Sequence, residues 1–203
     1  MATKEKIINA SIQLFNEYGF ANVRLQHIAD STGISVGNLA YHFKNKEAII
    51  TRAYETIGCE LQAVLSQFRS EPNLLDLENQ LASFYHFIVK FPFYFIDIIE
   101  IKRSHSHLHL ARQQFIMRMI MQIRKRFEYN IDRGVIKPEP FEGHYDHVAH
   151  AIWMVITFWI SQSIIKGDKS DVSSFKSVIW SQVYPYLTSK GIEEYQRLVL
   201  VRN

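Results

Sequence analysis

The chain has 203 residues, of which 47% are hydrophobic and 21% charged, and these proportions exclude general disorder. The formal net charge of +3 at pH 7 permits nucleic-acid binding without arguing for it, because the clustering of charge decides such binding. Eight glycines and five prolines are few for this length, which favours long helices over a sandwich of many short strands.

Helical periodicity begins directly after the N-terminus. Thr3 can cap a first helix, whose apolar residues recur at intervals of three and four until Gly19 ends it. A tight turn at Gly33 separates two short helices, and Asn45 can cap a long fourth helix. The helices expected in this part span residues 4–18, 26–32, 36–43 and 46 to about 69.

Longer and more aromatic helices are expected after Pro72. Pro92 separates the first two because the residue before a proline avoids helical geometry, and Pro185 should kink the last long helix. The expected helices span about 74–90, 93–102, 108–134, 144–166 and 171–190, with a short one over 192–200. The sequence shows no strand alternation of useful length, so the predicted fold is all-α.

The two short helices joined by Gly33-Ile34-Ser35 form a candidate helix-turn-helix. A glycine at the turn lets the second helix cross the first, and Ala29 and Leu39 are small or apolar enough for the crossing. The second helix turns small or polar side chains outward, namely Ser35, Val36, Gly37 and Asn38. Many helical hairpins share this pattern, so the geometry alone leaves both DNA binding and a plain hairpin open.

A further set of residues matches a known family in order and spacing over about the first 50 positions. The set comprises Leu14-Phe15, Gly19-Phe20, Ile28-Ala29, Gly33-Ile34-Ser35, Gly37-Asn38-Leu39, His42-Phe43 and Lys46-Glu47. Over this segment the chain resembles the DNA-binding region of the TetR family of bacterial regulators. Beyond it the resemblance is architectural, namely a helical domain of the right length with two long helices near its end.

The resemblance implies two domains and a regulatory function. It implies a three-helix DNA-binding domain over 1–50, continuing into a linking helix over 46–69, and a helical ligand-binding and dimerisation domain over 51–203. Such a protein regulates transcription as a dimer on a pseudo-palindromic operator in double-stranded DNA, and a small lipophilic or aromatic effector releases a repressor of this kind. A transcriptional activator or an effector-independent regulator of the same fold stays open.

The resemblance also assigns the DNA contacts. Ser35, Val36 and Asn38 match base-facing positions, where asparagine can pair with adenine and valine can touch a thymine methyl. Gly37 has no side chain, so the helix backbone can approach the DNA closely. The residues expected at phosphates are Arg24, Tyr41, His42, Lys44 and Lys46. Arg24 stands where the family usually has a Thr or Ser cap, and Ala40 stands where a tyrosine is common.

Aromatic residues crowd the C-terminal part and suggest an apolar effector pocket between helices, with a plain aromatic core as the alternative. The residues expected to bind the effector are Phe84, Phe87, Phe91, Phe95, Phe115, Met121 and Trp153. We expect the effector to tilt the helix over 46–69, which would change the separation of the two recognition helices.

The helix over 144–166 carries an apolar stripe of Trp153, Ile156, Ile160 and Ile164, which would be too exposed on a monomer. We therefore expect this helix and the one over 171–190 to pair with a second copy. The run over 148–165 is at the short end for a membrane span and contains polar residues, so no membrane is expected. The N-terminus lacks the features of a secretory signal, and one cysteine fits a cytoplasmic protein.

Neither an enzyme nor a metal site is expected. The sequence lacks a G-x-S-x-G motif, a Gly-rich phosphate loop and an H-E-x-x-H motif, so no catalytic residue is assigned. Two groups of histidines, 105/107/109 and His144, His147 and His150, lack a recognised zinc spacing, so no cofactor is expected. A metal-binding helical enzyme that uses the second group stays as the alternative.

Overall fold

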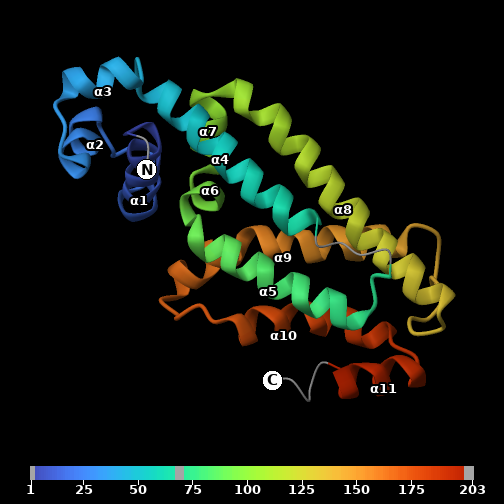
Figure 1. The fold of residues 1–203 in the computed structure, drawn as a ribbon. Helices are drawn as coiled ribbons and strands as arrows, with labels where there is room; N and C mark the ends of the chain where they lie inside the picture. The colour runs from blue at the N-terminus through green and yellow to red at the C-terminus, as the bar shows by residue number, and fades with distance from the viewer. Residues whose placement is uncertain (1–2, 67–70, 199–203) are drawn as a thin grey trace. The chain divides into compact units, whose positions relative to one another are not determined.

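The computed structural model describes residues 3–66 and 71–198 and consists of helices joined by turns and loops (Figure 1). Within these residues the only β-type pairing is an isolated antiparallel bridge between Ile136 and Leu187. The all-α prediction is confirmed. The chain forms two compact units, the first from 1–62 and 90–112 and the second from 63–89 and 113–203.

The first unit contains the helix-turn-helix segment and also a segment from the middle of the chain. Its elements are α1 (Thr3–Tyr18), α2 (Leu25–Thr32), α3 (Val36–His42), most of α4 (Lys46–Ser66), α6 (Pro92–Ile96), α7 (Ile98–Ser104) and η1 (Ser106–Leu108). The ring of Phe15 in α1 packs against Phe20 and against Phe93 of α6, with both centroid distances at 5.4 Å. The mid-chain segment is thus packed on the N-terminal helices.

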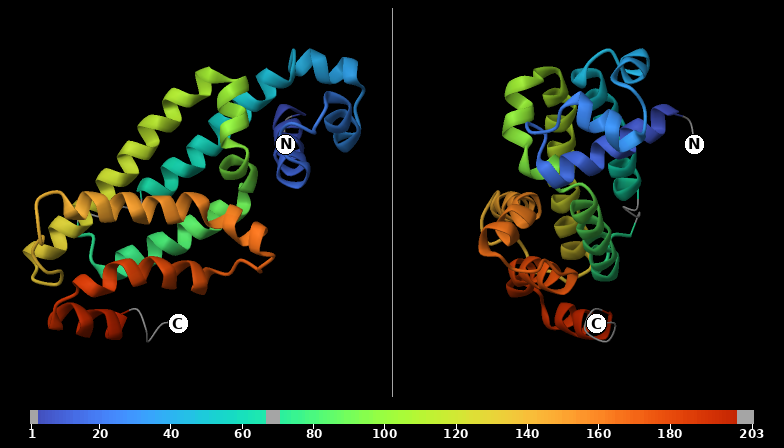
Figure 2. Two further views of the ribbon diagram at one scale, coloured as in Figure 1. Left: turned by 180° about the vertical axis from the view of Figure 1, so that it is seen from behind. Right: turned by 90° about the vertical axis from the view of Figure 1, so that its left-hand side faces the viewer.

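The second unit is a helical bundle. Its elements are α5 (Leu74–Lys90), most of α8 (His109–Asp132), α9 (His144–Lys166), α10 (Val172–Val183), η2 (Tyr184–Tyr186) and α11 (Ser189–Leu198). Figure 2 shows α5, α9 and α10 running side by side, with α11 next to α10. Fully buried side chains from three of these helices, among them Phe84, Tyr145 and Phe175, form the core.

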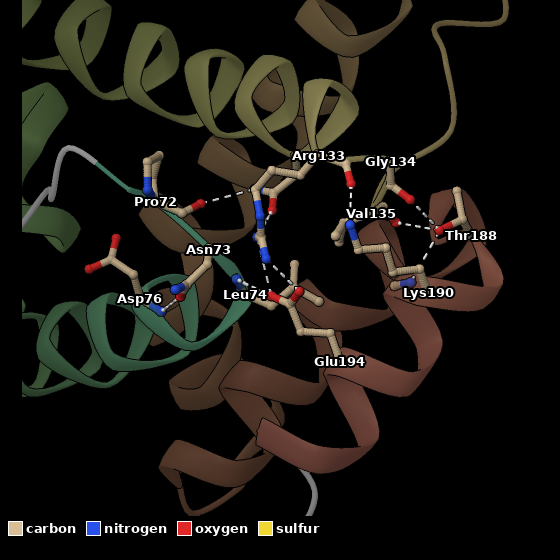
Figure 3. A network of polar contacts seen from close by, with 12 residues as sticks. Pro72, Asn73, Leu74, Asp76, Arg133, Gly134, Val135, Thr188, Lys190 and Glu194 are labelled. Atoms are coloured by element: carbon tan, nitrogen blue, oxygen red, sulfur yellow. Dashed lines mark hydrogen bonds and ion pairs between the residues drawn. The ribbon is translucent and has the colours of Figure 1, made fainter.

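A polar network attaches α11 to the rest of the second unit (Figure 3). The buried carboxylate of Glu194 accepts a hydrogen bond from Arg133 at 2.7 Å and another from the backbone N–H of Leu74 at 3.4 Å. Gly191 is also required here, because an added Cβ would lie 2.2 Å from the carbonyl oxygen of Val135. The glycine therefore lets two backbone segments approach closely.

Two predicted elements differ in the structure. The single helix expected over 93–102 is two helices that meet at Asp97, whose carboxylate accepts a hydrogen bond from the backbone N–H of Phe20 at 2.6 Å. Pro185 does not kink a long helix; α10 ends at Val183 and a 3-10 turn contains the proline. The expected helix ends at 67–69 and 199–200 lie outside the described residues.

Candidate nucleic-acid interface and ligand cavity

The turn between α2 and α3 is built by local backbone signals. Gly33 adopts a left-handed conformation with φ of +72°, which ends α2, and Ile34 donates to the carbonyl of Ala29 at 3.1 Å. The Ser35 hydroxyl then accepts a hydrogen bond from the N–H of Asn38 at 3.1 Å and caps α3. These bonds fix the tight turn between α2 and α3 that a helix-turn-helix requires.

The outward face of α3 is open and carries small side chains. Val36, Gly37 and Asn38 are exposed, and Tyr41 is 86% exposed with its ring 5.2 Å from the ring of His42. A Cβ added to Gly37 would meet nothing closer than the Ser35 hydroxyl at 3.9 Å, which is ordinary contact. The fold therefore does not require a glycine at this position, although a close approach by a partner would.

Arg24 precedes α2 as an exposed residue, and its backbone is capped in a way that the sequence analysis missed. Its N–H donates to the Nδ1 atom of His27 at 3.3 Å, so the histidine supplies one of the two bonds of a capping box. Arg24 and Lys44 are both exposed. A histidine three residues after the cap is the signal that could have predicted this bond.

Lys46 is the first residue of α4, as expected, and its ammonium group has partners within the first unit. Its ammonium group donates to the carbonyl of Phe20 and lies 4.1 Å from the centre of the Phe20 ring. Burial lowers the pKa of Lys46, while the charges of Glu100 and Asp97 act in the opposite direction. The side chain thus connects the start of α4 to Phe20, which follows α1 in the chain.

The seven residues expected to bind an effector do not form one cluster. Phe84, Phe115 and Trp153 do meet in the second unit, with the tryptophan ring 6.5 and 5.6 Å from the two phenylalanine rings. Phe87 is buried on α5, whereas Phe91 and Phe95 belong to the first unit. Met121 is 51% exposed and faces away from the core of the second unit.

The second unit contains a cavity of about 30 Å³ between α5, α8, α9 and α10. Phe84 is the one residue of the expected set that lines it, and the other walls are mostly aliphatic, among them Leu81, Ile123 and Ile156. A volume of this size holds roughly two water molecules, and typical ligand pockets are about 300–1,000 Å³. The cavity is therefore too small in this structure for a molecule of ordinary ligand size.

One edge of this cavity is polar, formed by Gln80, Arg126 and Asn130. Arg126 donates to Asp76 at 2.7 Å and to the side-chain oxygen of Gln80 at 2.8 Å. An arginine can only donate, so this bond fixes the orientation of the Gln80 amide. The amide nitrogen of Gln80 is buried without a hydrogen-bond partner among the described residues, which leaves its two N–H donors for a bound molecule.

The apolar stripe on α9 is divided differently from the expectation. Trp153 and Ile156 are buried within their own unit because they face α5 and α8. The exposed apolar side chains of α9 and α10 are Met154, Phe158, Ile164, Ile165 and Val178. By length and composition alone α9 could cross a membrane, and 28% of its most apolar window is buried.

The histidines do not form a metal centre in the described part of the chain. No three His, Cys, Asp or Glu side chains converge there as metal ligands. The ring of His144 packs against Phe141 and Tyr186, and the Nδ1 atom of His150 contacts the carbonyl of Asp146 at 2.9 Å. The side chain of His109 lies outside the described residues.

Two family models match the chain. The model described as "Bacterial regulatory proteins, tetR family" matches residues 7–53, and the one described as "Bacterial transcriptional repressor" matches residues 58–195. The first match contains the whole helix-turn-helix segment. The second covers most of the remaining chain.

Individual proteins are similar as well. YttP of Bacillus subtilis, described as a probable HTH-type transcriptional regulator, is 26% identical over 133 residues, which cover 60% of this chain and 64% of YttP. A TetR-family regulator from Marinobacter aquaeolei VT8 has a TM-score of 0.85 and 28% identity, over 100% of this chain and 98% of that one. FadR from Bacillus subtilis, solved with stearoyl-CoA, has a TM-score of 0.65 at 19% identity, over 88% and 97% of the two chains.

Proposed function

Because the chain belongs to the TetR family of bacterial transcriptional regulators, we propose that it is a ligand-responsive DNA-binding repressor that acts as a homodimer in the cytoplasm. The observation that carries this proposal is the open face of α3, where Gly37 is not needed by the fold. Because Gly37 lies on the exposed face of α3 in the helix-turn-helix, the missing side chain lets a partner approach the helix backbone closely there.

The proposed DNA contacts follow from exposure and chemistry. Asn38 and Val36 read base edges in the major groove, and Ser35 contributes its hydroxyl proton while its oxygen caps α3. The phosphate contacts come from Arg24, Tyr41, His42 and Lys44. Lys46 is left out because its ammonium group is already bound within the first unit. The helices up to residue 50 thus form the proposed DNA-binding domain, and residues 51–203 the proposed effector and dimer domain.

The proposed dimer interface is the exposed apolar face of α9 and α10, supported by Met154, Phe158, Ile164, Ile165 and Val178. Large apolar side chains exposed on two neighbouring helices are costly in water and indicate an interaction surface. Two copies related by a two-fold axis would present two α3 helices to successive major grooves, about 34–36 Å apart or at a multiple of it.

The proposed effector occupies the cavity of the second unit and enlarges it on binding. Its aliphatic walls select a lipophilic molecule, and the unpaired amide nitrogen of Gln80 selects one with a neutral hydrogen-bond acceptor. The effector would then weaken DNA binding to the extent that it prefers the DNA-free state of the protein. A tenfold loss of DNA affinity requires a coupling free energy of about 1.4 kcal/mol between the two sites.

Selection of operators from a pool of random duplex DNA tests the DNA-binding part of this proposal. We expect a pseudo-palindromic consensus, together with a dimer mass by light scattering at micromolar concentration. A monomeric mass, or recovered sequences without two-fold symmetry, would overturn the proposal that the protein binds DNA as a symmetric dimer.

Calorimetry with and without the selected operator tests the effector part. Stearoyl-CoA, the ligand of one structural relative, is the first probe, and an uncharged long-chain alcohol isolates the lipophilic contribution. Coupling is reciprocal, so operator should weaken probe binding by the same factor by which the probe weakens operator binding. A probe that binds equally with and without operator would not be an effector.

A further inference from the structure

The first unit contains a second, smaller cavity, which lies between α4, α7 and the start of α8. Its apolar wall consists of Ile98, Ile101 and Leu108. Its polar wall consists of Tyr54, Lys102, His105 and Arg112. The volume is about 10 Å³, which accommodates roughly one water molecule. The polar wall therefore contains three basic residue types and a phenol, and no acidic residue.

Arg112 is the unusual member of this wall, because it is only 7% exposed. Its Nη1 atom donates to the carbonyl of Tyr94 at 2.8 Å, and the guanidinium lies 4.1 Å from the centre of the Tyr94 ring. Its Nε atom is buried and has no hydrogen-bond partner in the part of the chain that the structure describes. A buried cation with an unsatisfied donor is costly, so the site lacks an acceptor.

A buried arginine of the second unit provides a direct comparison. Arg126 is as buried as Arg112, but it forms an ion pair with Asp76 at 2.7 Å. Among the described residues no ion pair joins Arg112 to a carboxylate. Asp97, on the same segment of the first unit, already accepts the N–H of Phe20. The charge of Arg112 thus lacks the counter-ion that the equally buried Arg126 has.

Two more donors line the same cavity. The Nδ1 atom of His105 is buried without a partner among the described residues, and burial lowers the pKa of this imidazole, so its neutral form can donate one proton from Nδ1. Burial raises the pKa of Tyr54 well above its ordinary value, with Arg112 acting in the opposite direction, so the phenol keeps its proton at neutral pH. Exposed Lys102 adds a positive charge at the rim.

We propose that this cavity binds the carboxylate group of a small organic acid. One carboxylate oxygen fills the space of a single water and accepts hydrogen bonds from the Nε atom of Arg112 and the Nδ1 atom of His105. The aliphatic residues contact the acid's carbon chain, which extends past Lys102 toward solvent. A carboxylate suits the site better than phosphate because it carries one charge and an apolar tail. This site is separate from the lipophilic cavity and does not depend on the proposed DNA-binding role.

The test is a calorimetric titration of the full chain without DNA at pH 7. The probe is hexanoate, and hexan-1-ol is the uncharged molecule of equal chain length. We expect hexanoate to bind, and an excess of hexan-1-ol, which can enter the aliphatic cavity of the second unit, not to displace it. Displacement of hexanoate by the alcohol, or no binding of hexanoate, would overturn the proposal. Binding of nitrate or phosphate without binding of hexanoate would also overturn it, since the site would then select inorganic anions.

Variants locate the binding. Arg112→Gln should weaken hexanoate at least tenfold, whereas Arg118→Gln, an exposed arginine on the same helix, should leave it unchanged. Because Arg112 also holds the Tyr94 carbonyl, Tyr54→Phe serves as a milder change that removes one hydroxyl and should weaken hexanoate about threefold. Unaltered hexanoate binding in a folded Arg112→Gln protein, or in Tyr54→Phe, would place the anion elsewhere and overturn the assignment.

Discussion

Two glycines, one in each compact unit, have opposite roles. Gly37 lies exposed on α3, where a Cβ would meet nothing closer than 3.9 Å, and Gly191 lies buried at α11, where a Cβ would lie 2.2 Å from a backbone carbonyl. The first keeps a surface clear for a partner molecule, and the second makes room for the protein's own chain. The comparison teaches that the proposed DNA-reading surface can be changed without loss of folding, whereas the second unit is limited by its packing.

Polar residues follow the same division. Asn38 on α3 points outward, with its side chain exposed. In the second unit, the buried Arg126 forms an ion pair with the buried Asp76 and a hydrogen bond with Gln80. The buried Glu194 forms an ion pair with Arg133. Removing one partner from such a pair leaves a buried charge uncompensated, so these residues tolerate little change.

The strongest test of this difference is Gly191→Ala. The added methyl group would overlap the Val135 carbonyl, so we expect the free energy of unfolding to fall by about 3 kcal/mol, measured by urea denaturation. Gly58→Ala, an exposed glycine inside α4 with open space around it, is the matched control and should be neutral or stabilising. Equal stability of the two variants would show that the second unit adjusts its backbone freely.

Asn38→Ala should have the next largest effect, and only on DNA binding. We expect a loss of about 2 kcal/mol at the selected operator, since a bidentate contact to adenine contributes about 1–3 kcal/mol. Fluorescence anisotropy with operator and with random duplexes separates the two affinities. Binding to random DNA and thermal stability should stay unchanged, and a similar loss on both DNAs would place Asn38 at a phosphate.

Gly37→Ala should change the stability of α3 and the affinity for DNA in opposite directions. Alanine should stabilise α3 by about 1 kcal/mol, because glycine has the lower helix propensity. Its methyl group should nevertheless weaken operator binding about tenfold, which corresponds to about 1.4 kcal/mol. The Gly58→Ala control should gain stability without any loss of DNA affinity. Unchanged operator binding by Gly37→Ala would remove the main observation behind the proposed function.

The smallest expected effect belongs to Lys44→Gln. Loss of one phosphate contact should reduce the slope of log affinity against log salt by about 0.9, with equal weakening on operator and random DNA. Lys169→Gln, an exposed lysine of the second unit, is the control and should leave the slope unchanged. If both variants changed the slope equally, the effect would reflect total charge and not a contact.

Much of the fold could be predicted because its signals are local. The bounds of α5 and α9 agree with the predicted ranges 74–90 and 144–166, and Gly33 and Ser35 form the turn and the cap expected of them. A cap, a left-handed glycine and an apolar stripe all depend on residues within four positions of one another. The positions of the helices and the turn in the helix-turn-helix could therefore be predicted from the sequence.

The failures share the opposite property. Asp97 interrupts a predicted helix where it binds Phe20, 77 residues earlier, and Lys46 turns toward a carbonyl 26 residues earlier. Periodicity says nothing about such distant partners. Sequence alone could not separate Phe91 and Phe95 from Phe84, because all three belong to the same aromatic run and only tertiary packing assigns them to different units.

The sequence by itself determined the helical class, the helix-turn-helix and the exposed residue types of α3, since all of these arise from short-range backbone and side-chain preferences. Only the tertiary structure decided which buried charges have partners. Arg112 and Arg126 are both buried arginines of α8. Arg126 pairs with Asp76 on α5, whereas no carboxylate of the described chain pairs with Arg112. The physical reason is that a counter-ion is set by distance in space, which depends on how remote helices pack.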